Sequence, residues 1–161
     1  MSTLLLEAVV EGKLVSAIAA KLVEAAITGV AVQGFWSPAL EGDVKAANAG
    51  TGSIIFCRVP PRGYGSYGTP TVRFNAQIAL EVLPSNDPAC ATLAPIFKCI
   101  MDLFMACTND AAAAADSLSA ANEFACDGVT IMPGGNINVT KAAWSVSTAL
   151  EIAGTELETE L

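Results

Sequence analysis

The segment from Thr71 to Leu83 constrains the fold most strongly, because apolar and polar residues alternate along it almost without interruption. In an extended strand the apolar set faces one side and the polar set faces the other, which is typical of a half-buried strand in an antiparallel sheet. The apolar set is Val72, Phe74, Ala76, Ile78, Leu80 and Val82, and the polar set is Thr71, Arg73, Asn75, Gln77 and Glu81.

A second long segment, 138–153, repeats this pattern and is expected to lie in the same sheet. One face is defined by Trp144, Val146, Thr148, Leu150 and Ile152, and the other by Ala143, Ser145, Ser147, Ala149 and Glu151. Shorter runs predict strands at 30–36, 53–59 and 128–132, with a loop over 37–52 and a turn at 133–136.

Two segments have helical spacing instead. The first covers 3–28, where Leu14, Ile18 and Leu22 are four apart, and Gly29 is the expected stop. The second begins with the capping residues 86–88 and carries an apolar stripe from Leu93 to Phe104. The alanine-rich segment 110–119 is either a further helical turn or a loose connector.

These elements predict an α+β fold in which an antiparallel sheet has two helices packed on one face, in the order α-β-β-β-α-β-β. Residues 1–153 are expected to form a single domain, and 154–161 an acidic C-terminal tail with Glu156, Glu158 and Glu160. No uncharged apolar window is long enough for a membrane-spanning helix, so no membrane contact is predicted.

Composition indicates association between copies. The chain is 53% hydrophobic and only 15% charged, and its mean hydropathy is +0.51. That is more apolar surface than we expect one small domain to hide, which favours an oligomer. The net charge of −8, from 16 acidic and 8 basic residues, lacks the basic footprint of a specific nucleic-acid-binding protein.

The absence of histidine excludes the commonest catalytic arrangements. Ser-His-Asp and Cys-His pairs and His-ligated metals all require it. The five cysteines form no CxxC pair and are odd in number, which argues against a zinc ribbon or a complete disulfide framework. An enzyme built on carboxylate, Lys or Tyr side chains stays open, but the sequence pairs no such groups at an informative spacing. We therefore predict that the chain is not an enzyme and has no catalytic residue, cofactor or metal site.

The most conspicuous loop runs from Pro60 to Pro70 and contains a G-x-G-x-x-G match at 63–68. That motif binds dinucleotides only between a strand and a helix, whereas a strand follows here, so nucleotide binding is not predicted. Its glycines suit a flexible hairpin tip. Because Tyr and Arg are enriched at protein interfaces, a sharper hypothesis is a docking loop built from Arg58, Arg62, Tyr64 and Tyr67.

The order of these elements resembles the tail terminator proteins of tailed bacteriophages and the related neck and tail-completion proteins. The likeness covers residues 3–153: an amphipathic N-terminal helix, a Gly-rich hairpin before a long alternating strand, a second helix opened by Asn86-Asp87-Pro88, and a final long strand. It is a resemblance of pattern and carries over no catalytic residue.

The resemblance implies a virion structural protein of the tail or neck, assembled in the host cytoplasm. Its partners would be copies of itself in a ring, usually of six, together with the tail tube protein and the head–tail connector or adaptor. The ring would cap the tube, stop its polymerisation and achieve head–tail joining, with DNA passing through unbound. An acidic channel would not hold DNA, although repulsion acts only within about 8 Å at physiological salt.

A second function stays open from the residues alone. A small α+β ligand-binding or dimeric accessory protein would use an apolar pocket between sheet and helices, near Phe35, Trp36 and Trp144. Paired aromatic residues at a strand end more often pack on the protein itself. Mass in solution separates these hypotheses, because a ring is far larger than a monomer or a dimer.

Overall fold

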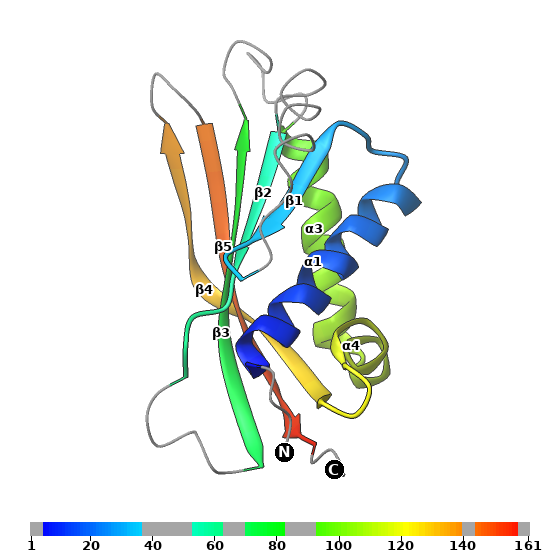
Figure 1. The fold of residues 1–161 in the computed structure, drawn as a ribbon. Coiled ribbons are helices and arrows are strands. Elements are labelled where there is room, and N and C mark those ends of the chain that lie inside the picture. Colours follow the sequence, from blue (N-terminus) through cyan, green and yellow to red (C-terminus); the bar gives the residue numbers. More distant parts are fainter. Residues whose placement is uncertain (1–4, 37–52, 63–69, 83–92, 140–143, 158–161) are drawn as a thin grey trace.

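The computed structural model describes residues 5–36, 53–62, 70–82, 93–139 and 144–157. Within them, five strands form one sheet in the order β1-β2-β3-β5-β4, and helices cover one of its faces (Figure 1). The strands are β1 (Val30–Gly34), β2 (Ser53–Arg58), β3 (Thr71–Val82), β4 (Phe124–Val139) and β5 (Trp144–Glu156). The helices are α1 (Leu6–Glu24), α3 (Leu93–Asn109) and α4 (Ala111–Leu118). The fold is therefore mixed α+β.

The alternation in β3 and β5 is confirmed, and it sets the position of the core. Residues 72, 74, 76, 78, 80 and 82 of β3 are buried, whereas the intervening positions 71, 73, 75 and 77 are exposed. β3 pairs antiparallel with β5 from Thr71↔Thr155 to Val82↔Trp144, so the two apolar faces lie side by side. Both face the helices, whose buried residues Leu14, Ile18 and Phe104 join the same core.

The expectation of a purely antiparallel sheet is wrong at one edge, because β1 and β2 are parallel. The reason lies in the connection 35–52, which is long enough to return the chain to the end where β1 began. The expected loop 37–52 lies outside the described residues, as do the capping residues 86–88 and the glycine-rich tip 63–69.

The expectation of two helices is also wrong, because the alanine-rich segment forms the third helix, α4. The Asp110 carboxylate accepts a hydrogen bond from the Ala112 amide at 2.9 Å and caps the helix start. Ala114 and Leu118 are fully buried. Small side chains let this helix approach the sheet closely, so the run needs few large residues to pack.

The predicted turn at 133–136 is instead an irregularity inside a single long strand. β4 continues to Val139, and its register against β5 shifts between Met132 and Asn136. Pro133 lacks an N–H donor and is tolerated because β4 is an edge strand within the described residues. Residues 138–139 therefore belong to β4, and the final strand begins at Trp144. It extends to Glu156, so three residues expected in the acidic tail belong to the sheet.

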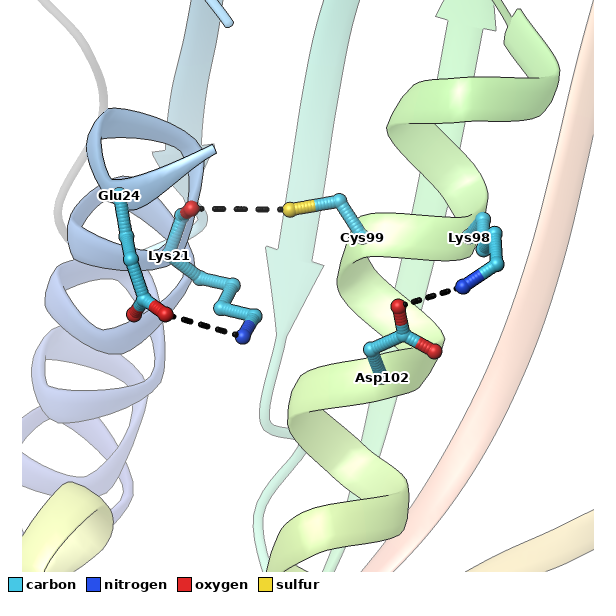
Figure 2. Close-up of polar contacts among 5 residues, drawn as sticks. All are labelled: Lys21, Glu24, Lys98, Cys99 and Asp102. Carbon is cyan, nitrogen blue, oxygen red and sulfur yellow. Dashed lines mark hydrogen bonds and ion pairs between the residues drawn. The ribbon is translucent and has the colours of Figure 1, made fainter. Parts of the chain in front are cut away.

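The end of α1 differs from the prediction that Gly29 stops it. The helix ends at Glu24, and the amides of Ala26 and Ile27 donate to the carbonyls of Val23 and Leu22. Ala26 has a φ of 57°, which is the left-handed conformation of a Schellman cap. Helix α3 packs beside this end, where the Cys99 thiol donates to the Lys21 carbonyl at 3.6 Å (Figure 2).

Candidate functional site

Arg62, expected on an exposed docking loop, is buried in an ionic cluster instead. Its Nε donates to Glu7 Oε1 at 2.8 Å, and the two side chains are 4% and 0% exposed. The guanidinium also lies 3.7 Å from the Glu156 carboxylate and 5.3 Å from the centre of the Phe74 ring. Arg62 therefore joins α1, β3 and β5 at the base of the glycine-rich loop, and its side chain is not a surface contact.

Of the other three residues of the proposed docking loop, the structure describes only Arg58. Arg58 lies at the end of β2 and is exposed, as the alternation of that strand predicts. Tyr64 and Tyr67 lie outside the described residues, so their docking role stays a prediction. The structure thus brings Arg58 and Arg62 to the same end of β2, with one facing solvent and the other buried.

A second buried carboxylate, Glu11, holds together the ends of β1 and β2. Its Oε1 accepts hydrogen bonds from the amides of Phe35 at 3.1 Å and Val59 at 3.2 Å, and its Oε2 accepts one from Trp36 at 2.6 Å. Gly34 makes this approach possible, because a Cβ there would lie 2.6 Å from the carboxylate carbon. Chain segments far apart in sequence thus share one acceptor.

Sequence reasoning missed the structural roles of Glu7 and Glu11, although a signal was present. Positions 7, 11, 14 and 18 follow the helical spacing of the apolar stripe. Both carboxylates are 0% exposed. Because a buried charge must be paired or hydrogen-bonded, a carboxylate on the apolar face of a helix predicts an internal partner.

An apolar hollow of about 500 Å³ lies where β1 and β2 end. It is lined by Phe35, Trp36, Arg58, Val59, Pro60 and Pro61. Trp36 is fixed there because its Nε1 donates to the Val59 carbonyl at 3.0 Å and its ring packs edge-on against Phe35. Phe35 itself is 66% exposed. This surface is called the aromatic hollow below.

The aromatic hollow does not include Trp144, so the pocket expected from the three aromatic residues is not formed. Trp144 pairs with Val82 on β3, and Val82 lies beside Ser53 at the start of β2. The hollow lies at the opposite end of β2. The two tryptophans are therefore separated along the strands as well as across the sheet.

A second apolar surface lies at that opposite end, where β4 and β5 approach their connecting segment. Ile137 and Val139 are 77% and 64% exposed, and they pair with Val146 and Trp144. This surface, comprising residues 136–139 of β4 and 144–147 of β5, is called the distal hairpin below.

The outer face of the sheet carries mostly small and polar side chains. A shallow depression of about 320 Å³ on it is lined by Phe56, Arg58, Gln77, Ile78, Ala79, Ser147, Thr148 and Ala149. On this face Arg73 of β3 pairs with Glu151 of β5 at 3.3 Å.

The described cysteines are buried, as expected of structural thiols. Burial, with a smaller contribution from the Glu11 charge, raises the pKa of Cys57 to about 12. Burial likewise raises the pKa of Cys126 to about 11 and that of Cys99 and Cys107 above its usual value. Because the thiolate is the reactive form, these four side chains are poor nucleophiles and poor metal ligands at neutral pH.

The described ranges contain no group of three or more Cys, Asp or Glu side chains arranged to hold a metal ion. No helix among them is long and apolar enough to cross a membrane. Comparisons of the sequence with protein-family models and with curated proteins find no match.

Proposed function

We propose that this chain is a structural protein of a tailed-bacteriophage virion, a tail terminator or neck subunit that works in a ring. The ring caps the tail tube, ends its growth and joins it to the head connector, and DNA passes through it without specific binding. The subunit acts by binding copies of itself and its neighbours in the virion, and performs no catalysis.

The observation that carries this proposal is the presence of two different apolar surfaces at opposite ends of the sheet. Phe35 is exposed in the aromatic hollow, and Ile137 and Val139 are exposed on the distal hairpin. A twofold dimer needs only one self-complementary patch, whereas a ring needs two patches that complement each other. Two separated apolar surfaces on one subunit therefore favour a head-to-tail assembly.

The buried polar network supports the same role, because it orders the end of the sheet that carries the aromatic hollow. Glu11 holds the backbone on both sides of the aromatic hollow, and Arg62 anchors the base of the glycine-rich loop to α1. Interfaces lose less conformational entropy on binding when their surfaces are already ordered. The buried carboxylates thus serve to position the aromatic hollow.

Electron microscopy of the purified protein tests this proposal. Closed rings with a central channel are expected in class averages at high protein concentration. In the virus that encodes the chain, loss of the protein should give tails of uncontrolled length that are not joined to heads. Single particles of one or two copies with a small molecule in the aromatic hollow would instead support a ligand-binding accessory protein, and would refute the ring.

A further inference from the structure

The distal hairpin exposes apolar side chains on the side of the sheet that faces the helices. Ile137 and Val139 pair with Val146 and Trp144, which share a face with the buried residues Leu150 and Ile152. Ile131 and Val146 still pack against the core. From Gly135 to Val139, however, every residue of β4 is exposed. Apolar side chains on the helix-facing side are therefore left in solvent.

β4 is also an edge strand. In the described part of the chain it pairs with β5 alone, so its outer backbone groups are open to a further strand. The register shift between Met132 and Asn136 interrupts the edge, and regular pairing with β5 resumes from Asn136↔Ser147 to Val139↔Trp144. Proteins that stay monomeric usually protect such edges with charges, bulges or proline. Here the bulge and Pro133 precede the last segment and leave it unprotected.

The charge pattern favours a second copy of this chain as the partner. Each copy carries a net charge of −8, so two copies repel each other wherever their acidic groups approach within about 8 Å. β4 from Gly128 to Val139 and β5 from Trp144 to Leu150 contain no charged residue. Copies can therefore meet here without bringing acidic groups of these two strand segments together, and the open edge can accept strand pairing from an identical chain.

We infer that the distal hairpin is a contact surface between copies, in which the edge of β4 pairs with a strand of the next subunit and Ile137 and Val139 are buried against it. This inference rests on the proposed ring, because it names the surface through which the ring is joined. It does not depend on the aromatic hollow, which is the candidate surface at the other end of the subunit.

Sedimentation velocity of a matched set of variants tests this contact. The double variant Ile137→Lys, Val139→Lys should weaken association by about 30-fold or more, as expected for residues central to an interface. Val23→Lys is the control, because Val23 is 78% exposed, almost the same as Ile137 at 77%, and lies on α1. It should assemble as the wild type does. Circular dichroism checks that each variant is folded.

A second variant and a second measurement keep the test decisive. Ile137→Thr, Val139→Thr retains β-branched side chains and should also weaken assembly. Amide hydrogen exchange at residues 136–139 should slow as wild-type concentration rises, and should not do so in either double variant. If the wild type assembles and both folded double variants assemble equally well, the contact is wrong and the ring stands. If the wild type remains a single chain at the highest concentration reached, the contact and the ring are both wrong.

Discussion

Replacing Glu11 by Gln is the sharpest test of how this fold is held together, because the change preserves shape and removes only charge and one acceptor. The carboxylate accepts three backbone hydrogen bonds, two through Oε1 and one through Oε2. In the Glu11→Gln variant the single side-chain oxygen can keep the bonds from Phe35 and Val59. The NH₂ group must then face the Trp36 amide, so that two donors oppose each other.

The expected cost follows from these bonds. Leaving the Trp36 amide without an acceptor costs about 1–3 kcal/mol. The two remaining bonds lose their charge assistance, which roughly halves their strength. Relief from burying a full charge offsets part of this loss. We expect the free energy of unfolding to fall by about 2–4 kcal/mol, which is a large share of the roughly 5–15 kcal/mol typical of a domain.

Urea unfolding followed by tryptophan fluorescence measures this change. Glu24→Gln on the same helix is the control, because its side chain is 74% exposed and 3.6 Å from Lys21, and exposed pairs contribute only about 0–1 kcal/mol. Amide exchange at Phe35, Trp36 and Val59 should accelerate only in Glu11→Gln. A Glu11→Gln protein as stable as Glu24→Gln would refute the role of Glu11.

Three further changes test other parts of the structure. Ala26→Gly should raise the free energy of unfolding by about 1 kcal/mol, because Ala26 has a φ of 57° that glycine adopts without strain; lower stability in chemical denaturation would contradict this. Arg62→Ala should lower the free energy of unfolding by about 3–5 kcal/mol, because Glu7 stays buried without this partner. The control Arg58→Ala should change the free energy of unfolding by less than about 0.5 kcal/mol. Equal effects of the two substitutions would contradict the burial of Arg62. The raised pKa of Cys57, about 12, means that the unfolded chain loses this proton first as pH rises. The contribution of the Cys57 thiol to stability is therefore complete below about pH 8.5 and declines above it. Between about pH 8 and about pH 10.5, Cys57→Val should lose less stability than the wild type. Parallel pH profiles of the two proteins would contradict the raised pKa of Cys57 as the cause.

Much of the fold could be predicted because strand periodicity is a local property. The alternation in β3 and β5 identified both faces of the sheet, since the polar and apolar residues of each strand separate cleanly. The parallel pairing of β1 could not be predicted, because it depends on where the connection 35–52 leads and not on the five residues of the strand. The helix α4 was ambiguous, because alanine permits both helix and loose chain, and burial of Ala114 and Leu118 decides between them.

The candidate site was less predictable, since its residues meet only in three dimensions. Arg62 lies next to a glycine-rich segment that the sequence predicts to be an exposed loop, and its partner Glu7 is 55 positions away in the sequence. Glu11 contacts two strand ends that come together only in the folded sheet. The distal hairpin was hidden because the Pro-Gly-Gly sequence at 133–135 is typical of a turn, which led to residue 139 being assigned to the final strand and not to β4.

The mass of the wild-type protein in solution tests the central claim most directly. Native mass spectrometry over a range of concentrations should show a closed assembly whose mass is a whole multiple, greater than two, of the 16.5 kDa chain. A species that never exceeds one or two copies would contradict the account, because a chain of that kind could not form the ring that its two apolar surfaces are proposed to build.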